Sequence, residues 1–361
     1  MNSLEKARKT INEVDEEMAR LFVKRMHAAK EVADYKKERG LKIYDKRREE
    51  EVVLRNSAFV EDPVIREYYV NFLKNNMALS REYQYRLMNG MKVAYCGTEG
   101  AFAHIATSKF FETAEKIAYS DFASAYLAVE NGECDACVLP VENSYNGEVG
   151  QVTDLMFSGS LFVNSIFEIE VTQDLLVVPG ATAADIKEVI SHPQALGQCA
   201  EYIKQKGYVQ HEYTNTALAA KYVAQKGDKS VAAIASAEAA KIFGLEILEK
   251  NINASRNNTT RFAVFTKAEN ERHSKNADTH TVILFTVRNE AGALAKAIEI
   301  IGKHGFNMIS LRSRPMKELS WQYYFYVEAE GNVHTEEGER MLLELREYCD
   351  RLKAVGTYVK N

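Results

Sequence analysis

The sequence predicts a multidomain chain in which three regions of different fold class follow one another. Residues 1–90 are expected to be all-α, residues 91–269 α/β, and residues 278–361 α+β and ferredoxin-like. The first region has no Pro or Gly between Ser3 and Arg39, as a long helix requires. The second alternates short apolar runs with helix-start signals, a pattern typical of α/β folds. The third has the element order βαββαβ, which is the ferredoxin-like plan.

The composition of the 361 residues is that of an ordinary globular protein, with 46% apolar and 27% charged residues. A net charge of −5 argues against nucleic acid as the main partner, so an anionic substrate would have to meet local cations. The chain has no recognisable leader and no apolar run that could span a bilayer, so we expect a cytoplasmic protein without a membrane partner. The five cysteines are scattered, and the spacing of Cys134 and Cys137 has no second pair, which favours a structural role over a metal site.

The first helix is expected to carry an apolar seam that a cation interrupts. Arg25 breaks the seam, and a buried arginine needs an anionic partner. Lys36 follows on nearly the same face, about 16 Å along the axis. Arg8 lies about 25 Å from Arg25, too far to share one small ligand within one helix, but an antiparallel dimer would bring it into the partner's site. The seam has the alternating spacing of a coiled coil: Leu4, Ala7, Ile11, Val14, Met18, Leu21, Ala28, Val32 and Tyr35.

A second helix is expected to start at Asp45, and a third to run from Pro63, a favoured first-turn residue, to about Asn89. Over residues 1–90 the chain resembles the all-helical chorismate mutases. The resemblance implies an intertwined dimer in which the first-helix arginine reaches the site of the other protomer. A helical dimerisation arm with solvated charges is the alternative. The resemblance rests on Arg8, Arg25, Lys36, Asp45, Arg48, Glu49, Ser80 and Gln84.

These residue types suit the rearrangement of chorismate to prephenate, which needs no nucleophile, base, metal or cofactor. The protein must hold a dianion in its compact conformer and stabilise negative charge that develops on the ether oxygen. By resemblance, Lys36 and Gln84 are the donors to that oxygen. Guanidinium groups match the carboxylates bidentately, while the two acids address the ring hydroxyl and orient the cations. Chorismate binding is thereby assigned to Arg8, Arg25, Asp45, Arg48, Glu49 and Ser80.

Polar loops follow short apolar strands at three places in the middle region, and a fourth polar loop leads into an apolar, β-prone run. Most of them lead into a helix, where free N–H groups and the helix dipole can form an anion site. Further helices are expected to begin after Asn215 and Ser236, the latter ending at Gly244. The four loops are Gly97–His104, Pro140–Gly147, Ser191–Cys199 and Thr259–Phe262.

In this order the four loops resemble the signature motifs of prephenate dehydratases, over roughly residues 91–268. The resemblance implies two α/β lobes like those of a periplasmic binding protein, with the active site in the cleft between them. Residues 91–168 would form one lobe and 169–250 the other, and a strand over 261–266 would return to the first lobe. Ala103 departs from the family pattern, because a hydroxyl residue is common at that position.

The implied reaction is loss of CO2 and hydroxide from prephenate to give phenylpyruvate. Aromatisation drives it, and tight ion pairing of the departing carboxylate would oppose CO2 release. By resemblance Thr260 donates to the leaving hydroxyl; threonine is a weak acid, so proton transfer and hydrogen bonding both remain open. His104 and His192 are expected to make structural hydrogen bonds. Prephenate binding is assigned to Gly100, Ala101, Phe102, Asn143, Ser144, Gln194, Arg261 and Phe262.

The last region is expected to follow a charged linker over residues 270–278. Its strands are predicted over 280–287, 307–314, 321–328 and 354–359, and its helices over 291–304 and 336–352. It resembles the ACT domain joined to prephenate dehydratases, whose ligand is phenylalanine. Arg312 stands where that family usually has Glu, and Ala291 where Pro is usual; a domain that only dimerises is the alternative. The resemblance assigns effector binding to Asn289, Gly292, Ala293, Leu294, Arg312, Ser313 and Arg314.

Together the three resemblances predict a cytoplasmic bifunctional enzyme of phenylalanine biosynthesis. It would be a homodimer or tetramer that acts on chorismate and prephenate, is regulated by L-phenylalanine, and needs no cofactor or metal. Two alternatives are a monofunctional prephenate or arogenate dehydratase with a helical assembly arm, and a non-catalytic amino-acid-binding regulator. The complete set from Arg8 to Gln84 argues against the first, and the intact Thr260-Arg261-Phe262 argues against the second.

Overall fold

The computed structural model describes residues 2–254, 258–270, 278–316 and 322–360. Asn257, Trp321 and most of the predicted 270–278 linker therefore lie outside the described residues. The chain divides into two compact units, Met1–Met91 and Lys92–Asn361. Within the described residues, no helix has both the length and the apolar character needed to cross a membrane. No group of three or more His, Cys, Asp or Glu side chains in that part of the chain could hold a metal ion.

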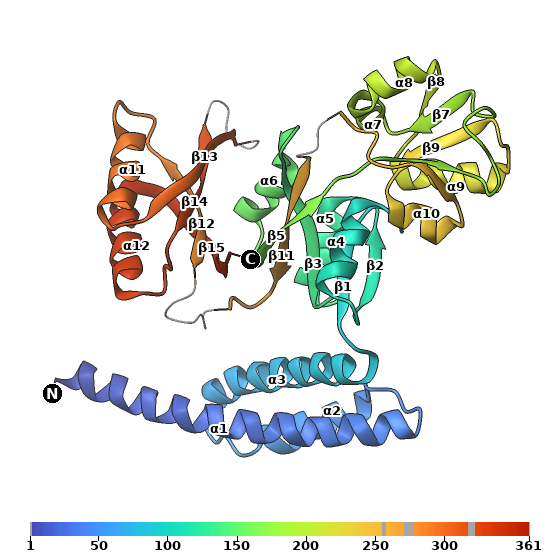
Figure 1. The fold of residues 1–361 in the computed structure, drawn as a ribbon. Helices are drawn as coiled ribbons and strands as arrows, with labels where there is room; N and C mark the ends of the chain where they lie inside the picture. The colour runs from blue at the N-terminus through green and yellow to red at the C-terminus, as the bar shows by residue number, and fades with distance from the viewer. Residues whose placement is uncertain (1, 255–257, 271–277, 317–321, 361) are drawn as a thin grey trace. The chain divides into compact units, whose positions relative to one another are not determined.

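The first unit consists of three helices whose ends follow the local sequence signals (Figure 1). Asn2 and Glu5 form a capping box at the first helix, and Asp62 caps the third with Pro63 in its first turn. The first and third helices pack together, and the buried side chains of the first are Ala29 and Ala33. The elements are α1 Ser3–Glu38, α2 Lys46–Ser57 and α3 Pro63–Asn89.

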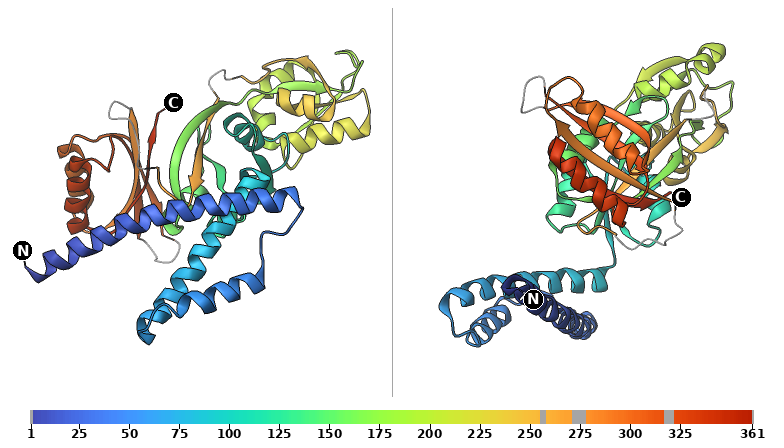
Figure 2. Two further views of the ribbon diagram at one scale, coloured as in Figure 1. Left: turned by 90° about the horizontal axis from the view of Figure 1, so that it is seen from below. Right: turned by 90° about the vertical axis from the view of Figure 1, so that its left-hand side faces the viewer.

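The predicted apolar seam of α1 is not buried within this chain. Leu4, Ile11, Val14, Met18 and Leu21 are 45–57% exposed. Figure 2 shows why, because the N-terminal part of α1 extends beyond α2 and α3. The helix was therefore predicted correctly, but its internal packing uses a different face from the seam.

The second unit begins with a six-stranded sheet that forms the first lobe. Its strand order is β2-β1-β3-β11-β5, and β4 also pairs with β3. β11 lies antiparallel between β3 and β5, which confirms the prediction that the last strand of this region returns to the first lobe. The elements are β1 Lys92–Cys96, α4 Phe102–Phe110, β2 Glu115–Tyr119, α5 Phe122–Glu130, β3 Ala136–Asn143, β4 Gly147–Glu148, α6 Gly150–Ser158, β5 Phe162–Glu170 and β11 Thr259–Thr266.

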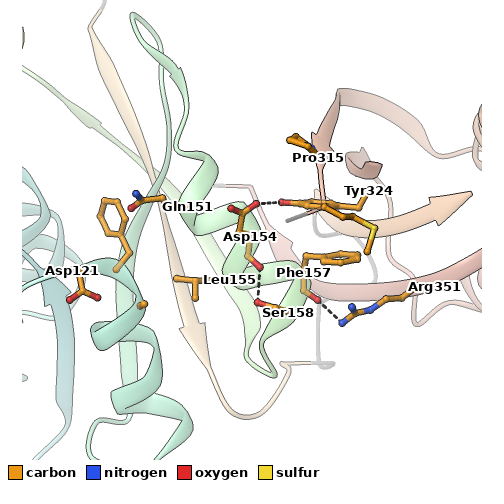
Figure 3. A pocket seen from close by; sticks show the side chains of 12 residues that line it. Asp121, Gln151, Asp154, Leu155, Phe157, Ser158, Pro315, Tyr324 and Arg351 are labelled. Atoms are coloured by element: carbon orange, nitrogen blue, oxygen red, sulfur yellow. Dashed lines mark hydrogen bonds between the residues drawn. The ribbon is translucent and has the colours of Figure 1, made fainter. Parts of the chain in front are cut away.

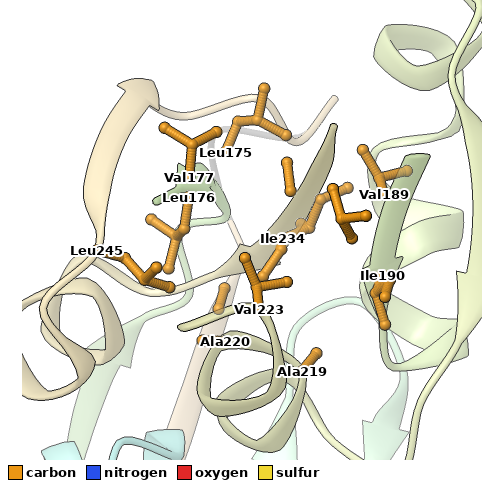
Figure 4. Packing of buried hydrophobic residues seen from close by; sticks show 14 of the residues in the cluster. Leu175, Leu176, Val177, Val189, Ile190, Ala219, Ala220, Val223, Ile234 and Leu245 are labelled. Carbon is orange, nitrogen blue, oxygen red and sulfur yellow. The ribbon is translucent and has the colours of Figure 1, made fainter. Parts of the chain in front are cut away.

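The second lobe is a five-stranded sheet of order β10-β6-β9-β7-β8 with its own apolar core (Figure 4). Its central strand β9 is buried at all five positions, as a strand covered on both faces should be. Asn215 and Ser236 cap their helices and Gly244 ends the second one, as predicted. The elements are β6 Asp174–Val177, β7 Glu188–Ser191, α7 Pro193–Gln198, α8 Ala200–Lys206, β8 Val209–Glu212, α9 Thr216–Lys226, β9 Val231–Ala235, α10 Ala237–Phe243 and β10 Glu246–Glu249.

The C-terminal region has the predicted βαββαβ order and forms an antiparallel sheet of order β13-β14-β12-β15. The largest difference from the predicted bounds is at the last helix and the strand that follows it. The helix expected to reach Leu352 ends at Tyr348, because Cys349 to Leu352 pair with Val287 to Phe285 on β12. The elements are β12 Thr279–Val287, α11 Ala293–Lys303, β13 Asn307–Pro315, β14 Tyr323–Glu330, α12 Glu336–Tyr348 and β15 Cys349–Val359.

Helices α11 and α12 cover one face of this sheet, and its other face packs on α6 and β5 of the first lobe. Figure 3 shows part of that contact. The rings of Phe157 and Tyr324 stack with centroids 4.2 Å apart, and the Tyr324 hydroxyl donates to Asp154 at 2.7 Å. Arg351 and Lys353 donate to the Phe157 and Met156 carbonyls at the end of α6. The C-terminal region is thus tied to the first lobe by both apolar and polar contacts.

Gly356 lies at the closest approach of these two sheets, which generates a test of the packing. A Cβ at Gly356 would stand 2.2 Å from the Val163 carbonyl oxygen. We expect Gly356→Ala to destabilise the second unit by about 1–3 kcal/mol, the usual cost of overpacking. Thermal unfolding of the full chain measures this effect. Gly302→Ala, in α11 with nothing within 4 Å of its Cβ, is the control and should be neutral or stabilising. Equal unfolding temperatures for Gly356→Ala and the parent would contradict the packing.

Candidate active sites

The first candidate site is a polar cluster between α1 and α3. The Arg25 guanidinium donates to the Asn76 carbonyl at 3.2 Å and makes a short hydrogen bond to the Ser80 hydroxyl. Burial lowers the pKa of Arg25. Each of these partners is neutral, so the half-buried Arg25 has no carboxylate among the contacts described, and an anionic ligand would complete its environment.

Lys36 and Gln84 each present part of their hydrogen-bonding capacity in this unit. Lys36 Nζ donates to the Ile43 carbonyl at 2.6 Å, which uses one of its three donor positions. Gln84 Nε2 donates to the Ser80 carbonyl at 3.2 Å. The other amide atom, Oε1, is buried and has no hydrogen-bond partner among the described residues. A buried polar atom of this kind is expected to meet a ligand or water.

The other predicted residues of this unit lie at the start of α2 or on the exposed part of α1. Asp45 caps α2 through the Arg48 N–H at 3.0 Å, so it has a structural role as well. Glu49 forms an ion pair with Arg81, a residue that the sequence analysis missed. Arg81 lies three residues before Gln84 on α3, so helical spacing could have indicated it. Arg8 is exposed, and α1 is one uninterrupted helix from Ser3 to Glu38, so within one chain Arg8 stays far from Arg25.

The second candidate site is a pocket of about 430 Å³ whose lining comes from both α/β lobes. Six predicted residues line it, from the first lobe and from α7 of the second. Arg and Lys are absent from this lining in the described part of the chain. The lining also contains six polar residues that the sequence analysis did not select as site residues: Asn146, Glu148, Gln173, Gln198, Asn215 and Thr216. The predicted residues that line it are Ala101, Phe102, Asn143, Gln194, Thr260 and Phe262.

Thr260 is oriented by Asn143, its neighbour across the β3–β11 pairing. Asn143 Oδ1 accepts from the N–H groups of Tyr145 and Asn146, both at 3.0 Å, which fixes which amide atom is the donor. Its Nδ2 donates to Thr260 Oγ1 at 2.9 Å. Because Nδ2 can only donate, the Thr260 hydroxyl accepts this bond and keeps its own proton for another acceptor. The geometry therefore leaves the Thr260 proton free for a ligand in the pocket.

The loop after β1 forms another wall of the pocket. Gly97 and Gly100 both have positive φ, +111° and +83°, which glycine adopts without strain. Ala101 precedes α4 and makes no side-chain cap, so the first N–H groups of that helix are not used by a cap. Gly100 itself is turned away from the pocket, and its N–H donates to His104 Nδ1 at 3.2 Å. His104 thus makes the structural bond expected of it, and burial lowers its pKa.

Two other predicted residues have structural bonds at this site. His192 caps α7 by accepting from the Gln194 N–H at 3.2 Å, as expected, and it also lines the pocket. Ser144 Oγ accepts from the Thr259 N–H at 3.0 Å, and this residue is not part of the lining. Gln173 and Gln198 have buried Oε1 atoms without a hydrogen-bond partner among the described residues. These two amides are therefore better placed to meet a ligand than Ser144.

Arg261 does not fit its predicted role in prephenate binding. Side chains alternate along a strand, so Arg261 leaves β11 on the face opposite Thr260. There it forms an ion pair with Glu328 of β14, with Nη1–Oε2 at 2.9 Å and Nη2–Oε1 at 2.5 Å. Burial alone would lower its pKa, but the Glu328 carboxylate raises it above the usual value. The physical reason for the correction is the period of two, which the motif Thr260-Arg261-Phe262 already contains.

The predicted effector residues are divided between two places in the C-terminal region. A hollow of about 370 Å³ is lined by Asn289 and Leu294, together with Glu290, Tyr323 and Asp350. Gly292 and Ala293 are not in its lining; Gly292 has φ +86° and precedes α11.

The β13 residues of the effector set lie elsewhere. Arg312 forms an ion pair with Glu142 at 2.6 Å and Arg314 with Asp154 at 3.0 Å, both in the first lobe, while Ser313 is exposed. The expectation that Arg312, Ser313 and Arg314 share one ligand with Asn289 is therefore not matched. Alternation along β13 turns the two arginines toward the first lobe.

Comparison with known proteins finds a family match in each unit. The family model for chorismate mutase type II matches residues 7–85, and that for prephenate dehydratase matches residues 93–270. The bifunctional chorismate mutase/prephenate dehydratase of Aquifex aeolicus is 33% identical over 100% of this chain and 99% of its own length. The bifunctional enzyme of Escherichia coli K12 is 28% identical over 99% and 96%.

Two solved structures share the fold of the second unit. The structure of GqqA, a quorum-quenching acylase, has a TM-score of 0.69 and 30% identity, and covers 75% of this chain and 98% of its own. The prephenate dehydratase of Arthrobacter aurescens in complex with L-Phe has a TM-score of 0.69 and 24% identity, and covers 75% and 90%. The second likeness shows the fold alone.

Proposed function

This chain belongs to the family of bifunctional chorismate mutase/prephenate dehydratases, and we propose that each activity resides in a different unit. Chorismate is converted to prephenate in the helical unit, and prephenate to phenylpyruvate in the pocket around Thr260. The observation that carries this proposal is the separation of the two polar sites. Arg25, Ser80 and Gln84 cluster within Met1–Met91, whereas Thr260 and Asn143 meet within Lys92–Asn361.

In the helical unit the protein's task is to hold and polarise a dianion. Arg25 and Arg48 bind the two carboxylates, because guanidinium groups match them bidentately. Lys36 and Gln84 donate to the ether oxygen, where negative charge develops as its C–O bond breaks. Lys36 has donor positions left beside its bond to the Ile43 carbonyl. A flip of the Gln84 side-chain amide would put its NH2 group at the position of Oε1, which has no hydrogen-bond partner among the described residues. The amide could then donate a hydrogen bond from that position.

A second copy of the chain completes this site. The exposed seam of α1 is an apolar face on an otherwise polar helix, and it continues into a groove of about 520 Å³ between α1 and α3. Met18, Leu21, Phe72 and Leu79 line that groove, which an apolar helix face would fill. An antiparallel α1 from the second copy would cover the seam and carry its Arg8 toward Arg25. Pairs of dimers could build a tetramer from the same chain.

In the second unit the pocket favours departure of CO2 and of the ring hydroxyl. Lys and Arg do not contribute to its described lining, so the carboxylate that leaves is not held in an ion pair. Thr260 donates its free proton to the departing hydroxyl as a hydrogen bond that strengthens as negative charge develops on that oxygen. Gln173, Gln194 and Gln198, with the N–H groups near Ala101, hold the remaining oxygens of prephenate.

The C-terminal region is proposed to be an ACT domain that binds L-phenylalanine. Its βαββαβ sheet supports this, as does the hollow beside Asn289 and Leu294, where Glu290 and Asp350 could meet an ammonium group and Tyr323 an aromatic ring. Inhibition requires that phenylalanine bind two conformations unequally. The five free thiols, all unpaired in this chain, support a reducing cytoplasmic location.

A coupled assay of the full chain tests the proposed function. Supplied with chorismate, the parent should form prephenate and then phenylpyruvate, monitored separately. Lys36→Ala should lower mutase turnover by about 100-fold or more, yet still convert supplied prephenate. Thr260→Ala should accumulate prephenate, with dehydratase kcat lower by about 10²–10⁴-fold.

Matched substitutions at the second site identify the hydroxyl. Thr260→Ser should keep more dehydratase activity than Thr260→Ala, because the hydroxyl remains. Thr259→Ala is the control, since Thr259 is not in the pocket lining. A parent without mutase activity would favour the monofunctional dehydratase, and a parent without either activity the binding regulator.

Mixed dimers test whether Arg8 acts in the other protomer. Arg8→Ala and Lys36→Ala should each be nearly inactive as mutases, but a heterodimer regains one site with both groups intact. Co-expressed copies with two different tags, purified on both, should therefore recover mutase activity. If the doubly tagged heterodimer remains as inactive as the separate variants, Arg8 acts within its own chain.

A phenylalanine titration tests the effector hollow. The parent should show a heat of binding and lose dehydratase activity as phenylalanine is added. Gly292→Val forces a β-branched residue to φ +86°, so the Asn289–Leu294 turn must shift and both effects should disappear. Gly305→Val is the matched control, since Gly305 has φ +81° in the same region but lies after α11, outside the Asn289–Leu294 turn. A parent that binds no phenylalanine at millimolar concentration would leave the region a dimerisation domain.

A further inference from the structure

The strands that carry Thr260 and Asn143 are braced on their opposite face by charged residues. In the antiparallel pairing of β11 with β3, Thr260 is opposite Asn143 and Arg261 is opposite Glu142. Thr260 and Asn143 belong to the pocket face, and the next residue on each strand belongs to the back face. Each residue of the proposed catalytic pair is therefore covalently joined to a charged residue on the other side of the sheet.

Those two charges are held by two more from the C-terminal region. Arg261 contacts Glu142 at 3.4 Å and forms a two-pronged ion pair with Glu328 of β14. Arg312 of β13 contacts Glu142 at 2.6 Å. We call these four residues, Glu142, Arg261, Arg312 and Glu328, the back-face ladder. It contains two positive and two negative charges, so it is balanced.

The buried end of the back-face ladder is the Glu328 carboxylate, which is 0% exposed. The hydroxyls of Tyr326 and Tyr358 both donate to it, so its acceptor positions are well used. Burial would raise the pKa of Glu328, but the Arg261 guanidinium lowers it below the usual value, so Glu328 is ionised at neutral pH. Buried ion pairs often stabilise a fold no more than apolar side chains of the same size would. A role in geometry is therefore the better explanation of this one.

The position of the ladder coincides with an irregularity in the sheet. The β11–β3 register shifts between Arg261 and Phe262, directly after the Arg261–Glu142 pair and one residue beyond Thr260. A β-bulge interrupts the regular hydrogen bonding and re-aims neighbouring side chains. On the β3 side the backbone near Thr260 is thus less restrained than in a regular ladder, while its pairing with β5 is regular there. On the back face, the Arg261 side chain ties this part of β11 to the C-terminal region.

We propose that Glu328 is a positioning residue for the dehydratase reaction, acting through Arg261 to keep the Thr260 hydroxyl in register with Asn143. Arg312 has the same effect on Asn143 through Glu142. The proposal rests on the function proposed for Thr260. It gives Arg312, which departs from the residue usual in the ACT family, a partner in the first lobe. The C-terminal region thus supplies part of the geometry of a reaction that occurs on the other face of the sheet.

Kinetics of Glu328→Gln in the full chain test this proposal. The substitution keeps the shape of the side chain and removes its charge, so Arg261 loses its two-pronged partner and retains only the longer contact to Glu142 at 3.4 Å. We expect dehydratase kcat to fall by about 10- to 100-fold, as for a small misplacement of a catalytic group, with KM changed by less than about threefold. Mutase activity of the same molecules should be unchanged. Glu328→Asp, which keeps the charge, should recover part of kcat.

A double variant separates positioning from general damage. With Thr260→Ala already present there is no hydroxyl to position, so adding Glu328→Gln should lower kcat no further. If the second substitution lowers kcat by the same factor in both backgrounds, Glu328 does not act through Thr260 and the proposal is wrong. A parent without dehydratase activity would instead overturn the function proposed for this pocket, so the two failures are distinguishable.

Two tyrosines give a matched pair of milder variants, useful where Glu328→Gln fails to fold. Tyr358→Phe removes a hydroxyl that donates to Glu328, and Tyr324→Phe removes one that donates to Asp154. Both side chains are 2% exposed and belong to the same sheet–lobe contact. Tyr358→Phe should lower dehydratase kcat by about threefold or more, and Tyr324→Phe should not. Equal effects of the two substitutions would assign the loss to packing and overturn the proposal.

Discussion

The antiparallel pairing of β11 with β3 is the constraint on which the second unit depends. This strand returns to the first lobe only after the chain has built the whole second lobe, so the pairing closes a long excursion. Its register brings Thr260 opposite Asn143, and the period of two sends Arg261 to the other face. A one-residue slip would exchange those faces, removing the hydroxyl from the pocket and burying a guanidinium in it. The apolar core and the buried charges therefore both select one register.

The two reactions place opposite electrostatic requirements on the groups that bind the substrate carboxylates, which explains the different residue types of the two sites. In the first reaction both carboxylates are retained, so arginines can bind them throughout without opposing the change. In the second, one carboxylate must leave as CO2, and a cation bound to it would stabilise the starting state more than the transition state. The described lining of the second pocket accordingly contains amides, hydroxyls and one carboxylate, that of Glu148, and no Lys or Arg. Arg261 is close in sequence but is neutralised by Glu328 on the far face.

Capping and turn residues in the sequence predicted most helices and strands. The features that were not predicted depend on packing between residues that are far apart in the sequence. Pro63, Ser236 and Gly244 mark helix ends because caps depend on a few neighbouring residues. The end of α12 at Tyr348 was missed, because pairing of the next residues with β12 overrides their helical pattern. The apolar seam of α1 was predicted, but the structure of a single chain does not show which surface covers it.

The same distinction applies to the sites, and it explains the role of the C-terminal region. Motifs identified Thr260 and Asn143, since their chemistry is visible in the residue type, but not the direction in which Arg312 or Arg314 points. That direction depends on the first lobe, which lies far away in sequence. An effector that moves β13 or β14 would act on Glu142 and Arg261 directly, one residue from the pocket on each strand. Because the ladder is balanced, displacing either C-terminal member leaves one charge in excess among the part-buried Arg261 and Glu142 and the remaining member, which opposes the movement. The contacts with the C-terminal region and the pocket lie on opposite faces of the same sheet. Coupling between them can therefore act across that one sheet and does not require a long chain of contacts.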